Sequence, residues 1–398
     1  MKKIKIKRKI SIVIFSILFI FIFLTGCNYF PKFVEIDDNF IVLALGIDKG
    51  IENKDNFRVT LVTKDLRETT DTKQEGGANK GVFVKFESAT IFDAIRRIHT
   101  IAYKDVFYGH IEFIIIGEEL ARENINKTLD FIVRNYELRT MMPILIARGI
   151  TAEEILDSED EYENFVPNIL DELLKNIGGH SISKVVSLKD VCVSFNSEYG
   201  DTIIGSIHKK NIQGENSKEI TTIELDGYAV FNKFKLIDFL LQNNARGANF
   251  INNDINSGII VIEDATGKKN SLEILEATSK IEPKYINNTF EANISIKVIT
   301  NIDEIQNEEN YFTVELIDEF NNKQKNVVLQ EAQSALNFSQ QNGVDIFNIG
   351  DEIYHKYPLK WDKIKDNWKE IYKQMKININ VETKINGTHI IYDPIGVK

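Results

Sequence analysis

The first 27 residues restrict most strongly what this chain can become. Residues 2–9 carry six lysines and arginines and no acid, and residues 10–24 form an apolar run. That run is 15 residues long, whereas a helix needs roughly 20 residues to cross the hydrocarbon core of a bilayer. Leu24, Thr25, Gly26 and Cys27 then match a lipobox. The sequence therefore predicts a signal peptide over 1–26 that is cleaved, and a mature protein held outside the cytoplasm by a lipid on Cys27.

Cysteine content limits how the mature protein can be stabilised. Cys192 is the one cysteine that remains besides Cys27, so no disulfide can form within the mature chain and a hydrophobic core must supply its stability. No activating cluster surrounds Cys192 in the sequence, and we interpret it as a small core residue rather than a nucleophile.

Net charge excludes one class of partner. Loss of the six cationic residues with the signal peptide takes the formal charge from −11 to −17. Nucleic-acid binding needs clustered lysines and arginines, so an acidic body argues against it. The same charge repels anionic headgroups, and membrane contact is expected to depend on the lipid and on protein partners rather than on a basic face.

Apolar periodicity predicts an α+β fold with mixed sheets and flanking helices. Strands are expected at 40–47, 57–63, 82–86, 111–116, 144–147, 223–231, 259–263, 272–281, 289–300 and 377–385. Helical spacing occurs at 91–101, 120–133, 236–245, 311–342, 346–356 and 361–372. Thr151 and Glu154 form a capping box that opens a short helix. Polar breaks at 209–219 and 266–271 then divide the mature chain into an N-terminal domain (27–208), a small middle domain (209–268) and a C-terminal domain (269–398).

Catalytic and metal-binding motifs are absent from the sequence. It contains no G-x-S-x-G elbow, Walker A loop, H-E-x-x-H or C-x-x-C pattern, and its six histidines are scattered. We therefore expect no enzymatic activity, no metal and no cofactor.

Two features leave alternatives open. Asp48 is either a catalytic acid at the end of a strand or, as we favour, the cap of a local turn that Gly46 permits through a positive φ. Trp361 and Trp368 lie seven residues apart on a predicted helix that also contains Tyr372. Core packing is the first interpretation of this stripe, and an exposed surface for docking a partner is the second.

Motifs spread along the chain resemble the Ger(x)C family of spore germination lipoproteins, the C subunits of GerA-type nutrient germinant receptors. They are the lipobox at Cys27, 42–48 (VLALGID), 108–112 (YGHIE), 116–121 (IGEELA), 129–131 (LDF), Arg134, 137–139 (ELR), 227–231 (GYAVF), 245–247 (ARG), 344–347 (VDIF), Gly350, His355, Pro358, Trp361 and Trp368. The sequence departs from the family at Asn135 and Tyr136, where similar proteins usually have Asp-Pro.

The resemblance implies a non-catalytic subunit of about three α+β domains, lipid-anchored on the outer face of the spore inner membrane. Its expected partners are the two membrane-embedded A and B subunits of the receptor. A solute-binding lipoprotein that works with a transporter is the alternative function. It is disfavoured because such a protein needs two similar lobes around a cleft, and the units predicted here differ in size and element order.

Overall fold

The computed structural model describes residues 39–64, 82–102, 105–157, 166–179, 181–214, 219–306 and 313–388. The predicted signal peptide and Cys27 lie outside these residues. Within them, no helix is both long enough and apolar enough to cross a membrane.

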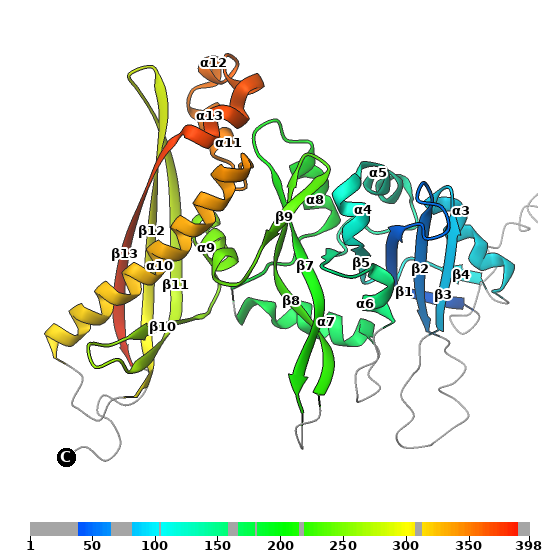
Figure 1. Ribbon diagram of the computed structural model, residues 1–398, viewed down its shortest axis with the longest axis horizontal. Coiled ribbons are helices and arrows are strands. Elements are labelled where there is room, and N and C mark those ends of the chain that lie inside the picture. Colours follow the sequence, from blue (N-terminus) through cyan, green and yellow to red (C-terminus); the bar gives the residue numbers. More distant parts are fainter. Residues whose placement is uncertain are drawn as a thin grey trace, which may run out of the picture. The chain divides into compact units, whose positions relative to one another are not determined.

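The first of two sheets has nine strands (Figure 1). Their order is β3-β2-β1-β5-β6-β7-β8-β9, with β4 paired to β1. The strands are β1 (Asn39–Lys49), β2 (Phe57–Lys64), β3 (Val82–Ser88), β4 (Asp105–Phe107), β5 (Phe113–Ile116), β6 (Ile144–Ala147), β7 (Thr202–Gln213), β8 (Glu219–Asn232) and β9 (Lys235–Leu240). The central neighbours β1, β5, β6 and β7 run parallel, and β2, β3, β8 and β9 continue the sheet in antiparallel pairs.

Helices cover both faces of the centre of this sheet, and for that reason β5 and β6 are apolar and buried at every position. One core contains residues of α3 (Ile91–Arg96), α4 (Glu118–Glu123), α5 (Asn126–Arg134) and α8 (Leu188–Phe195). The core on the other face contains residues of α6 (Ala152–Leu156) and α7 (Val166–Asn176). The predicted capping box is confirmed: Thr151 accepts from the amide of Glu154, whose carboxylate accepts from the amide of Thr151.

The second sheet has four strands in the order β10-β11-β12-β13. They are β10 (Ile259–Glu263), β11 (Lys269–Ile286), β12 (Thr289–Ile305) and β13 (Lys376–Thr388), and β12 and β13 pair in parallel. The long helix α10 (Val314–Asn342) packs on this sheet and against α9 (Gln242–Asn252). Three short helices, α11 (Ile349–Lys356), α12 (Pro358–Trp361) and α13 (Trp368–Gln374), connect α10 to β13. Two mixed sheets with flanking helices confirm the predicted α+β class.

The described strands of the middle unit predicted over 209–268 are divided between the two sheets. The break at 209–219 lies in the hairpin between β7 and β8, which pair up to Gln213 and Glu219. Strands β8 and β9 belong to the first sheet, whereas β10 belongs to the second. The helix predicted from Leu236 is wrong at its start, because Leu236 and Leu240 are the buried residues of strand β9 and α9 begins at Gln242.

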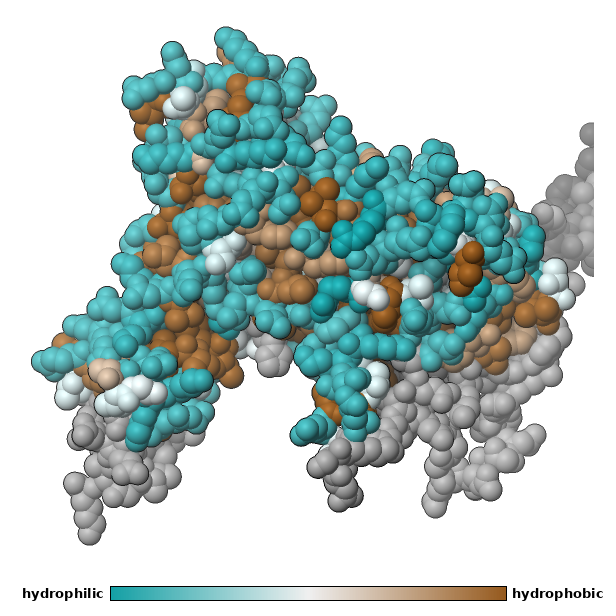
Figure 2. Space-filling view, viewed as in Figure 1, coloured by the Kyte–Doolittle hydropathy of each residue, from teal (hydrophilic) through white to brown (hydrophobic). Residues whose placement is uncertain are grey.

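On the face that Figure 2 shows, most of the surface is hydrophilic and apolar residues form smaller patches between hydrophilic ones.

Candidate functional site

Two aspartates, Asp345 buried and Asp201 half-buried, connect the start of β7 to the segment after α10. The amide of Asp345 donates to Oδ2 of Asp201 at 2.8 Å, and the amide of Asp201 donates to the carbonyl of Asp345 at 2.9 Å. The Asp345 carboxylate accepts in turn from the amides of Ile349 (3.1 Å) and Gly350 (2.7 Å) and from Nε1 of Trp368 (3.2 Å). Burial raises the pKa of Asp345 to about 7, although these amides favour its ionised form. We call this arrangement the aspartate joint.

Aromatic side chains surround the aspartate joint. Trp361 is 1% exposed, Trp368 9% and Tyr372 0%. The rings of Trp361 and Trp368 are 5.2 Å apart, and the hydroxyl of Tyr372 shares a hydrogen bond of 2.6 Å with Ser339. Core packing is therefore the correct interpretation of this stripe. The alternative of an exposed docking patch is wrong for these three side chains, because packing against α10 and α11 removes them from solvent.

Close backbone contacts explain two of the glycines singled out in the sequence. A Cβ on Gly350 would lie 2.2 Å from the carbonyl of Tyr199 and 2.8 Å from the ring of Trp361. A Cβ on Gly247, in α9, would lie 2.1 Å from the carbonyl of Glu331 in α10. Next to it, the guanidinium of Arg246 forms an ion pair with the buried carboxylate of Glu331. These motif residues therefore hold elements together.

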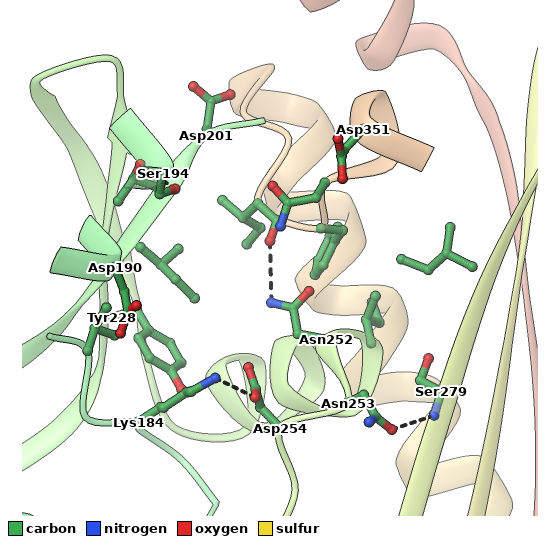
Figure 3. Close-up of a pocket in the computed structure, with 18 of the residues that line it drawn as sticks. Lys184, Asp190, Ser194, Asp201, Tyr228, Asn252, Asn253, Asp254, Ser279 and Asp351 are labelled. Atoms are coloured by element: carbon green, nitrogen blue, oxygen red, sulfur yellow. Dashed lines mark hydrogen bonds and ion pairs between the residues drawn. The ribbon is translucent and has the colours of Figure 1, made fainter. Parts of the chain in front are cut away.

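A groove of about 720 Å³ lies beside the aspartate joint (Figure 3). Asp190, Ser194 and Asp201 line it from the first half of the chain, and residues 252–254 and Asp351 line it from the second. Several of its polar groups already have partners: Lys184 forms an ion pair with Asp254 (2.6 Å), and Asn253 accepts from the amide of Ser279 (2.9 Å). Carboxylates outnumber lysines five to two among the lining residues, so the groove repels anions.

A pocket of about 520 Å³ lies at the carboxyl ends of the parallel strands, where ligands bind in many open α/β sheets, and two of the carboxylates that line it already accept backbone amides. Asp48, at the end of β1, accepts from the amides of Ala152 (2.8 Å) and Glu153 (2.9 Å) at the start of α6. Burial raises the pKa of Asp48 to about 6. A Cβ on Gly117 would lie 2.0 Å from Oδ1 of Asp48, so only glycine fits there. Glu118 accepts from the amide of Gly149 at 2.6 Å.

The structure corrects our interpretation of Asp48 and Gly46. Asp48 does cap backbone amides, but these lie 104 and 105 residues away rather than in a local turn. Gly46 has no positive φ and lies within β1. Its Cβ would lie 2.8 Å from Leu156 and 3.3 Å from Ala152, so the approach of α6 is what requires glycine.

Reactive side chains are dispersed. Cys192 is half-buried against the first core, and burial raises the pKa of its thiol, which disfavours the nucleophilic thiolate. Among the described residues, no group of three His, Cys, Asp or Glu side chains could hold a metal ion. The contact of Asp201 with Asp345 and the ion pair of Arg246 with Glu331 were not predicted from the sequence. The two aspartates are 144 residues apart, and Arg246 and Glu331 are 85 residues apart.

Known proteins share both halves of this chain. Residues 32–209 match the family model described as the spore germination protein N-terminal domain, and residues 226–389 match the model described as spore germination B3/GerAC like, C-terminal. Spore germination protein KC of Bacillus subtilis (strain 168) is 24% identical over 390 residues, covering 91% of this chain and 92% of that protein. Spore germination protein B3 of the same organism is 23% identical over 344 residues, covering 84% and 88%. The crystal structure of the GerBC protein superimposes with a TM-score of 0.57 at 19% identity, covering 86% of this chain and 96% of GerBC.

The two matched models account for nearly all of the described residues. The chain belongs to the family of GerAC-like spore germination proteins, the C subunits of germinant receptors, which is a non-catalytic family.

Proposed function

We propose that this chain is the lipid-anchored C subunit of a nutrient germinant receptor and that it works on the outer face of the spore inner membrane. Family membership along both halves of the chain supports the receptor role. The lipobox that ends at Cys27 supports the anchor, because it follows an apolar run of the length typical of a signal peptide. Two acyl chains on Cys27 would hold the protein stably, since each buried methylene contributes about 0.8 kcal/mol.

The partners in this proposal are the membrane-embedded A and B subunits of the same receptor. A docking surface has to use exposed groups, and two regions of the C-terminal half offer them. Strand β13 forms one edge of the four-stranded sheet, and an edge strand can pair with a further strand. In the helical segment before it, Leu359 is 81% exposed. Germination requires, in this proposal, that the C subunit stay assembled with both partners.

Affinity purification from spore membranes tests the proposal. The full chain with a C-terminal affinity tag is expected to co-purify the two polytopic subunits of the germinant receptor. A solute-binding lipoprotein would instead bring down a transporter permease, and that result would replace the receptor role. The structure argues against that alternative, because the nine-stranded and four-stranded sheets do not form two similar lobes.

A further inference from the structure

Exposed apolar side chains gather at the end of the first sheet where β1 begins. Val82 is 44% exposed, Ile101 61%, Phe107 46% and Met141 67%. We call these four residues the amino edge. They come from four separate segments of the chain, so their proximity is a product of the fold.

Strand register places the amino edge beside the start of β1. Val82, the first residue of β3, is opposite Thr63, which is opposite Val42 in β1. Phe107 ends β4, which also pairs with β1; because β5 takes the same side of β1 from Ala44 onward, β4 has to lie against the beginning of the strand.

The other two residues reach the same end from neighbouring segments. Met141 comes shortly before β6, whose residue Ile144 pairs with Ile114 near the start of β5. The parallel strands β1, β5 and β6 all begin at this end. Ile101 closes the helical turn that leads into β4.

The proposed lipid lies close to this edge along the chain. Eleven residues, 28–38, separate Cys27 from Asn39, the first residue of β1. A chain of 11 residues spans at most about 40 Å. The start of β1 therefore stays within about 40 Å of the proposed lipid, so the amino edge is able to reach the bilayer.

We propose that the amino edge rests on the lipid bilayer and fixes how the protein is oriented on the membrane. This inference rests on the proposed lipid anchor at Cys27. A bilayer interface accepts separate protruding apolar side chains, whereas a protein partner needs a continuous complementary surface. The acyl chains supply retention, and the role of Phe107 and Met141 is to select one orientation among those that the tether allows.

Site-specific quenching in vesicles tests this orientation. The full chain, lipidated at Cys27, is reconstituted into phosphatidylcholine and phosphatidylglycerol vesicles whose phosphatidylcholine carries brominated acyl chains. In a Cys192→Ala background, Phe107→Cys and Met141→Cys are each labelled with a bimane fluorophore. Ile51→Cys is the matched control, because Ile51 is 62% exposed and follows β1 at its opposite end.

The expected result is severalfold stronger quenching at positions 107 and 141 than at position 51. Equal quenching at all three positions, or none at any, in protein that floats with the vesicles would overturn the inference and leave the anchor intact. If the protein does not float with the vesicles, the anchor itself is wrong and the inference is overturned with it.

Discussion

Asp345 and Asp201 bind each other twice, once from the amide of Asp345 to the carboxylate of Asp201 and once from the amide of Asp201 to the carbonyl of Asp345. Among the described residues no lysine or arginine forms an ion pair with Asp345, whose carboxylate accepts hydrogen bonds from two backbone amides and from the indole of Trp368. The connection between the first sheet and the C-terminal helices is therefore sensitive to the protonation of Asp345.

Stability is expected to fall as the pH rises through the range in which Asp345 ionises. Burial raises the pKa of Asp345 from 3.8 to about 7, so between these values the folded protein holds a proton that the unfolded chain has lost. Linkage then makes the free energy of unfolding decrease with pH over this interval, by a few kcal/mol for a shift of this size. The urea midpoint of the purified protein should be higher at pH 5 than at pH 8.

Asp345→Asn isolates this contribution. The amide cannot ionise, so the variant should lose part of the pH dependence, and it should be destabilised by about 1–3 kcal/mol at pH 5 because its NH2 group faces backbone donors. Asp48 and Asp201 also have raised pKa values and contribute in the same direction, so only the difference between variant and wild type reports Asp345. Asp351→Asn is the control. If the urea midpoint of Asp345→Asn changes between pH 5 and pH 8 as much as that of the wild type, Asp345 is not a source of the pH dependence.

Gly46→Val should destabilise the first sheet. The added side chain meets Leu156 and Ala152 of α6, and overpacking of this kind costs about 1–3 kcal/mol. Gly179→Val is a matched control, since Gly179 has no atom within 4 Å of its Cβ position. Thermal denaturation should show a lower Tm for Gly46→Val and an unchanged Tm for Gly179→Val. Leu156→Ala in the same chain should recover part of the loss, and the absence of any recovery would mean that α6 is not the obstacle.

The purified protein should bind no nutrient amino acid or sugar with micromolar affinity. Several polar groups that line its groove beside the aspartate joint are already bound to other groups of the chain, which leaves fewer of them to converge on a small ligand. In the pocket at the carboxyl ends of the parallel strands, the carboxylates of Asp48 and Glu118 already accept backbone amides. Titration calorimetry against a panel of germinants tests this, and one saturable micromolar ligand would move nutrient sensing into this subunit.

Local patterns predicted most of the strands and helices. Residues 259–263 were predicted as a strand and form β10 with the same bounds, and the alternation at 377–385 lies within β13. Leu236 was misassigned because Leu236 and Leu240 are four residues apart, a spacing that fits a helical face as well as alternate positions of a strand. This segment is a strand rather than a helix because it pairs with β8.

The functional meaning of single residues was harder to predict, because their partners are remote in sequence. The sequence shows that Asp48 ends a strand, but the amides that it caps belong to α6. In the same way, the stripe of Trp361 and Trp368 does not reveal that Asp345 accepts from the Trp368 indole in a buried site. The spacing of residues along the chain does not predict contacts between segments that are remote in sequence. The resemblance to a family pointed to Asp48, Asp345 and Trp368 as motif residues, but it did not show which groups they contact.

The central claim is that a lipid on Cys27 holds this chain in a germinant receptor. Comparison of Cys27→Ala with Cys192→Ala in spores tests it most directly, since Cys192 is the other cysteine of the chain. Both variants are measured for palmitate labelling, for recovery in the inner-membrane fraction and for nutrient-triggered germination. The account predicts that Cys27→Ala loses labelling and germinates poorly while Cys192→Ala behaves like wild type. Full labelling and normal membrane retention of Cys27→Ala would contradict the lipoprotein assignment.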